Sequence, residues 1–157
     1  MSFERYLEHH WIRRPETSPQ ELAELLAIAD RDIDQSQTPG LGPEWRFEIA
    51  YNAALQLATA ALAAAGFQAE RQNKHQRTIE CLAFAIGLDR DDVDLFDICR
   101  RKRHTNVYEQ VGAISNHEAS EMIAFAIRLR TQVQTWLGDY HSALIPATES
   151  SGDADRT

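Results

Sequence analysis

The sequence contains few residues that form disulfides or interrupt helices and strands, with 2 cysteines, 5 prolines and 7 glycines in 157 residues. Two cysteines in apolar helical patterns are too few for a disulfide framework, which excludes a disulfide-rich secreted domain. The longest alanine-rich stretch, residues 53–65, is interrupted by Gln56 and Thr59. It is too short to cross a membrane, which takes about 20 apolar residues. Because the N-terminus also lacks a secretory signal, we expect a cytoplasmic protein with reduced thiols and no membrane partner.

Several chemical motifs are also missing. The sequence has no glycine-rich phosphate-binding loop and no nucleophile elbow. The acidic residues 89–97 lack the central glycine and terminal glutamate of a calcium loop, and His117 with Glu121 is a pair without identifiable further ligands. We therefore expect no metal site and no cofactor. The net charge of −8 repels polyanions, so a nucleic-acid partner requires a local basic patch.

What is present is helical periodicity. Alanine, leucine, glutamate, arginine and glutamine dominate, and apolar residues recur at helical spacing without strand-like alternation. The pattern predicts an all-α protein with an N-terminal helix within residues 1–17, a helical domain over residues 18–145 and a disordered acidic tail over residues 146–157. The helices are expected at residues 3–14, from Pro19 to the loop at 37–43, and at 43–65, 72–86, 89–109 and from about 116 to Gly138.

Local signals set several of these boundaries. Ser18 before Pro19 is typical of a helix start, and Gly66 is well placed to end a helix in the left-handed conformation. The alanines on one face of residues 43–65 indicate that another helix approaches closely, since large side chains would hold the two axes apart.

The outstanding feature of this acidic protein is a basic run from Arg100 to His104. On a helix, Arg100, His104 and Tyr108 lie on one stripe, each four residues from the next. A guanidinium beside an imidazole suits a phosphodiester, because arginine neutralises the anion and histidine moves protons near neutral pH. The alternative is a solvated basic helix end that pairs with the acids upstream.

Two other residues allow two interpretations each. His75 is either a residue of a binding cleft or a helix-start residue hydrogen-bonded to nearby backbone. Cys99 is either a core residue or a thiol whose pKa the neighbouring arginines lower. Cys81, between apolar residues of a helical pattern, is expected in the core.

Several segments resemble HEPN domains. Residues 50–58 (AYNAALQLA) and 61–67 (ALAAAGF) are similar to the second core helix of that family, and residues 74–79 (KHQRTI) to the histidine-containing start of the third. Residues 100–108 (RRKRHTNVY) are similar to the signature on the following helix, an arginine, a polar residue and a histidine or tyrosine further on. The resemblance covers approximately residues 18–137.

The resemblance implies a four- to five-helix, up-and-down bundle that forms a homodimer, with both signature helices lining one cleft. Many HEPN proteins are metal-independent endoribonucleases, often toxins paired with a nucleotidyltransferase or other antitoxin, and others bind RNA, nucleotides or proteins. By this resemblance Arg103 is the leading arginine and His104 its polar neighbour. Tyr108 stands where the ribonucleases have histidine, and the unperturbed tyrosine pKa near 10 makes it a poor general base.

Two functions of different classes follow. The first is an HEPN-like dimer that binds RNA or nucleotide phosphate, as a degenerate or weak ribonuclease of a toxin–antitoxin or defence system. Its candidate catalytic residues are Arg103, His104 and Tyr108, and its candidate phosphate-binding residues are Arg100, Arg101, Lys102 and His75. The second is a non-catalytic interaction module whose basic stripe docks an acidic protein or a nucleotidyltransferase, with Trp11, Trp45 and Trp136 in core and dimer packing.

Overall fold

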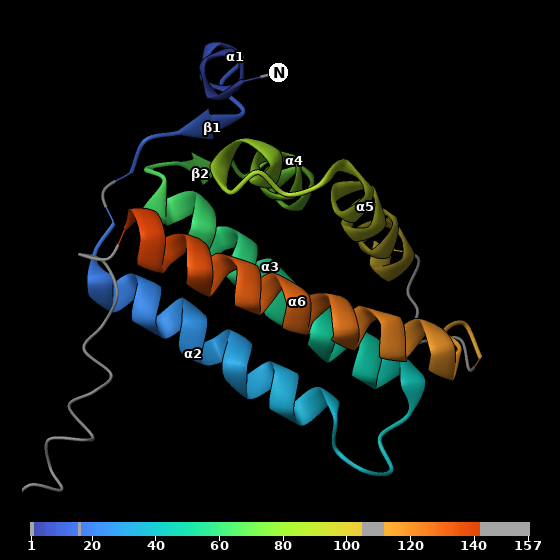
Figure 1. Cartoon of the computed structure of the whole chain (residues 1–157). Helices are drawn as coiled ribbons and strands as arrows, with labels where there is room; N and C mark the ends of the chain where they lie inside the picture. Colours follow the sequence, from blue (N-terminus) through green and yellow to red (C-terminus); the bar gives the residue numbers. More distant parts are fainter. Residues whose placement is uncertain (1, 16, 105–111, 142–157) are drawn as a thin grey trace, which may run out of the picture.

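The computed structural model describes residues 2–15, 17–104 and 112–141 (Figure 1). The elements along the chain are α1 (Phe3–Glu8), β1 (Ile12–Arg13), α2 (Pro19–Ser36), α3 (Pro43–Ala64), β2 (Gln68–Ala69), α4 (Lys74–Ala85), α5 (Arg90–His104) and α6 (Asn116–Tyr140). The predicted all-α class is confirmed, since helices make up most of the described chain. None of the described helices is both long enough and apolar enough to cross a bilayer.

Helix α3 is the centre of the fold. It packs along α2 and α6, and α4 lies against another of its sides (Figure 1). With neighbours on several sides, α3 is buried around most of its circumference, and Ala53, Ala54, Ala58 and Ala60 have no exposed surface. The predicted alanine face is therefore confirmed and extends further round the helix than one stripe. Small methyl groups allow this because they let several helices pack on α3 at once.

Most helix limits follow the local signals. The Ser18 hydroxyl accepts a hydrogen bond from the Glu21 amide at 3.2 Å, and Gly66 follows α3 with φ of +96°, so both predictions are confirmed. Helix α6 begins with a capping box between Ser115 and Glu118. The predicted stop at Gly138 is wrong, because α6 continues to Tyr140.

The prediction of a helix over residues 3–14 is wrong beyond Glu8. His10 adopts a left-handed conformation with φ of 60°, and the chain then extends so that Ile12 pairs with Ala69 in a two-stranded antiparallel sheet. Strands of two residues are too short to show alternation, which is why the pattern missed them. The sheet places a small second core over α3 and α4, made by Tyr6, Ile12, Leu62, Phe67, Ala69 and Cys81.

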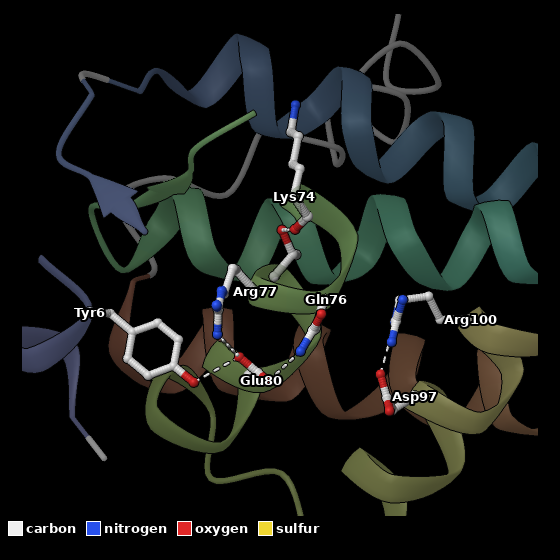
Figure 2. A network of polar contacts seen from close by, with 8 residues as sticks. Tyr6, Lys74, Gln76, Arg77, Glu80, Asp97 and Arg100 are labelled. Carbon is white, nitrogen blue, oxygen red and sulfur yellow. Dashed lines mark hydrogen bonds and ion pairs between the residues drawn. The ribbon is translucent and has the colours of Figure 1, made fainter. Parts of the chain in front are cut away.

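A polar network joins this N-terminal segment to α4 (Figure 2). Glu80 is its hub: it accepts hydrogen bonds from the Tyr6 hydroxyl at 2.8 Å and from Gln76 at 3.2 Å, and it pairs with Arg77 at 3.1 Å. The Arg77 guanidinium also stacks over Trp11, 3.7 Å from the ring centroid. Trp11 therefore serves internal packing, in a position set by the β1 turn and not by helical spacing.

Candidate functional site

The C-terminal end of α5 is tied to α3 through Arg103. The Arg103 Nε donates to both carboxylate oxygens of Glu48, at 2.9 and 2.8 Å. The same guanidinium lies 5.3 Å from the ring centroid of Tyr51, one helical turn further along α3. A carboxylate and an aromatic face thus hold Arg103 together, and the pair is shielded, with the Glu48 side chain only 13% exposed. This contact places the basic run beside the central helix.

Tyr51 links the three helices that form the site. Its ring, with no exposed surface, lies 5.8 Å from the Phe96 centroid on α5 and 6.3 Å from the His75 centroid on α4. Burial raises the pKa of the Tyr51 phenol, although the charges of Arg103 and Arg100 oppose that shift. The phenol therefore stays protonated at neutral pH. Its hydroxyl is buried and has no hydrogen-bond partner within the described chain.

The charges of the basic run affect the pKa of His75. Burial lowers the pKa of its imidazole, and the neighbouring basic residues Arg103, Lys74, His104 and Arg100 lower it further. The imidazole is consequently neutral at pH 7 and can accept a proton. Within the described chain no hydrogen bond joins His75 to backbone, so the structure does not show the helix-start interpretation of this residue.

The three arginines and the lysine of the basic run all have acidic partners. Arg100 and Arg101 share Asp97, at 2.8 and 2.9 Å, and the first of these pairs is drawn in Figure 2. Lys102 pairs with Glu118 of α6. The interpretation of a helix end paired with acids upstream therefore holds for Arg100 and Arg101, whereas Lys102 and Arg103 reach across to other helices. These acids reduce the net positive charge of the surface.

The structure brings some predicted site residues together and separates others. The pKa of His75 is lowered by the charges of Arg100, Arg103 and His104. Two other predicted residues pair elsewhere, Arg101 with Asp97 and Lys102 with Glu118. Tyr108 lies outside the described residues, as does the predicted tail over residues 146–157.

Sequence reasoning missed two members of the site. Tyr51 belongs to the helical pattern of residues 43–65 and is buried, but the sequence did not predict its contacts with Arg103 and His75. Glu48 was not singled out at all. The available signal was a charged residue one turn before Tyr51, because a shielded carboxylate requires a partner.

The interpretation of Cys99 as an activated thiol is wrong. Burial raises the pKa of Cys99 to about 11, although Lys102 lowers it in part, and burial raises the pKa of Cys81 to about 12. Since the thiolate is the nucleophile, at pH 8 only about one Cys99 thiol in a thousand is reactive, against about a quarter at an ordinary pKa near 8.5.

We therefore expect iodoacetamide to alkylate both cysteines at least one hundred times more slowly in the folded protein at pH 8 than in 8 M urea. Mass spectrometry over a time course measures both rates on tryptic peptides. The folded-state rate should rise about tenfold for each pH unit up to pH 10, because the thiolate fraction rises by that factor. Equal rates in buffer and urea would contradict this prediction.

The described helices thus bring Glu48, Tyr51, His75 and Arg103 together where α3, α4 and α5 meet. The charges of Arg100 and His104 contribute to the lowered pKa of His75. His117 and Glu121 form an exposed pair 3.6 Å apart on α6, remote in sequence from that group. Within the described residues no three histidine, cysteine or carboxylate side chains cluster as metal ligands would. No protein-family model matches the chain, and neither a curated protein nor a solved structure matches it.

Proposed function

We propose that this protein binds the phosphates of RNA or of a nucleotide through Arg100 and Arg103, with His75 and His104 beside them. The observation that supports the proposal is that the Tyr51 ring lies 5.3 Å from the Arg103 guanidinium of α5 and 6.3 Å from the His75 ring of α4, while the charges of Arg100, Arg103 and His104 help to lower the pKa of His75. Arginine recognises phosphate through several charge-assisted hydrogen bonds. The resemblance to HEPN domains supports the same ligand class and adds a homodimer in which two copies of α5 meet.

The chemistry that suits this group is metal-independent cleavage of RNA. In such a reaction the ribose 2′-hydroxyl loses its proton to a base and attacks the adjacent phosphorus, and the 5′-oxygen of the next nucleotide leaves with a proton. The products are a 2′,3′-cyclic phosphate and a 5′-hydroxyl. A neutral His75 is able to accept the first proton, and the arginines stabilise the charge on phosphorus. We propose weak activity, because Tyr108 takes the place of the expected histidine.

The ion pairs give the proposal a measurable signature. An RNA phosphate at Arg103 competes with Glu48, and one at Arg100 competes with Asp97. Each contact exchanges one ion pair for another, so the gain in affinity per contact is small and depends strongly on salt.

We expect Arg103→Ala to weaken RNA binding about threefold to tenfold at 50 mM salt. The slope of log affinity against log salt should fall by about 0.7 in magnitude, the value for one lost contact to a single strand. Fluorescence anisotropy with a labelled 20-nucleotide RNA across a salt series measures both quantities.

The matched control is Arg128→Ala, which also removes one arginine charge. Arg128 lies on α6 and pairs with Asp92 of α5. This variant should leave the affinity and the salt slope unchanged. If Arg103→Ala behaves like this control, the RNA proposal fails. End analysis of mixed RNA incubated with each protein tests cleavage, since the wild type and Arg128→Ala should generate cyclic phosphates and Arg103→Ala should not.

A second candidate function is a protein-interaction module. The observation that favours it is the exposure of two large apolar side chains, Trp45 at 55% and Ile98 at 51%, on helices that also carry Glu48 and the basic run. An acidic protein such as a nucleotidyltransferase would then contact the basic run and these side chains. In that case Ile98→Asp abolishes complex formation, while neither Ile98→Asp nor Arg103→Ala changes RNA binding.

A further inference from the structure

A cavity of about 310 Å³ lies beside α2 and α3, lined by none of the site residues described above. Its walls are mainly apolar and include Leu25 and Ile28 of α2, Leu62 of α3 and Phe67 from the turn that follows α3. Volumes of about 300–1,000 Å³ with mostly apolar walls are typical of small-molecule sites. The size and lining therefore fit a short alkyl chain or a single aromatic ring system.

A second, polar hollow adjoins this cavity. The two share Gln68, Ala69 and Lys74 as lining residues, and the hollow adds Arg13, Glu70 and Arg71. Its three cations face one carboxylate, that of Glu70, which lies 3.8 Å from Arg13. In the described chain neither Arg71 nor Lys74 has an acidic partner. The hollow thus carries a net positive charge next to an apolar cavity.

Lys74 is also the first residue of α4, and Figure 2 shows its side chain pointing away from the network around Glu80. The first turn of α4 contains no acidic residue, and the N-cap Asn73 makes no side-chain hydrogen bond to it. A helix start normally carries an acid that complements the positive end of the dipole. Here that end reinforces the charges of Lys74 and Arg71, and all three favour an anion.

Three other polar residues of the cavity, Thr17, Glu21 and Glu24, orient such a ligand. Glu21 and Glu24 of α2 also line the cavity, and within the described residues neither pairs with Lys74. Their charge repels an anionic head from the α2 side and directs it toward Lys74. Thr17 lines the same cavity, and its hydroxyl is buried without a hydrogen-bond partner in the described chain. A bound ligand with a polar atom along its length would provide that partner.

We propose that the cavity and the hollow together form a binding site for a small amphipathic anion. Its apolar body fills the cavity between α2 and α3, and its carboxylate or phosphate head lies at Lys74 and Arg71. The site is separate from the RNA-binding proposal, since it uses neither the basic run of α5 nor Tyr51.

The probes for this site are decanoate and decyl phosphate, which share an apolar chain and differ in the anionic head. Calorimetry below the micelle concentration should show saturable binding of one molecule per chain for at least one of them. Decyltrimethylammonium, with the same chain and a positive head, should bind at least tenfold more weakly. Tighter binding of decyl phosphate would identify phosphate as the preferred head, and tighter binding of decanoate would identify carboxylate.

Variants locate the bound probe. Lys74→Gln should weaken its binding about threefold to tenfold, whereas Arg5→Gln, which removes the same charge from the exposed surface of α1, should leave it unchanged. Ala63→Phe places a ring in the cavity and should abolish binding. In the wild type, amide NMR signals of Leu25, Ala63 and Lys74 should shift on titration, which locates the site even where a variant does not fold.

The proposal is overturned if neither anion binds saturably, if the cationic amphiphile binds as tightly, or if the NMR shifts fall on other residues. It is also overturned if a folded Ala63→Phe variant binds the anion normally. RNA binding by a folded Ala63→Phe variant should equal that of the wild type, because Ala63 lines the cavity and is not part of the proposed RNA site. Failure here and failure of the RNA proposal are therefore distinguishable.

Discussion

Replacing Phe96 by alanine is expected to lower the free energy of unfolding by about 3–5 kcal/mol, the usual cost of removing a buried aromatic ring. Phe96 is completely buried, and its ring lies 5.1 Å from the Phe125 centroid and 5.8 Å from the Tyr51 centroid in edge-on contacts. It therefore joins α5 to α6 and α3 at one point. Since a domain of this size is stable by only about 5–15 kcal/mol, the loss is a large fraction of the total.

Urea unfolding followed by circular dichroism at 222 nm measures this loss. Ile98→Ala is the matched control, because Ile98 lies on the same helix and is 51% exposed; it should change the free energy of unfolding by less than about 0.5 kcal/mol. A loss below 1 kcal/mol for Phe96→Ala would contradict this prediction. It would mean that the Phe96 contacts do not hold α5, which carries the basic run, against α3 and α6.

Replacing Glu48 by glutamine is expected to act in opposite directions on stability and on RNA binding. The variant keeps the size of the side chain but removes the charge that pairs with Arg103 at 2.8 Å. Breaking a fully buried pair costs about 3–5 kcal/mol. The Arg103 side chain is 31% exposed, and water partly solvates it, so we expect a loss of about 1–3 kcal/mol.

The same change removes the anion that competes with RNA for Arg103. Under the proposed function, affinity for a labelled RNA at 50 mM salt should rise about threefold to tenfold. Asp92→Asn is the control: it removes the same charge beside Arg128 and should affect RNA binding by less than twofold. A Glu48→Gln variant that loses stability but binds RNA no better would show that the pair serves structure alone.

The helical framework was predictable because its signals are local. Apolar spacing placed the helices, and Ser18 and Gly66 marked two boundaries through hydrogen bonding and a left-handed turn. These effects involve residues within four positions of one another, so they are written into short windows of sequence. The sheet was not predictable in this way, because Ile12 and Ala69 are distant in the chain and each strand has two residues.

The candidate site was only half predictable. Composition singled out Arg100 to His104 as an unusual basic run, and the HEPN resemblance added His75. Neither the composition nor the resemblance could show that Arg103 pairs with Glu48, 55 residues earlier in the chain. They also could not show that Arg101 pairs with Asp97. The partner of a charged side chain depends on which helices pack together, and helix periodicity does not specify their arrangement.

The sequence by itself determined that this chain is helical, where most helices begin and end, and which alanines fill the central helix, because backbone hydrogen bonding and apolar burial act on every turn. Only the tertiary structure decided which charges meet, how far burial shifts the pKa values of His75, Tyr51 and Cys99, and where a cavity remains. Those properties depend on distance through space and on exclusion of water, both of which arise only when α3 is enclosed by its neighbours.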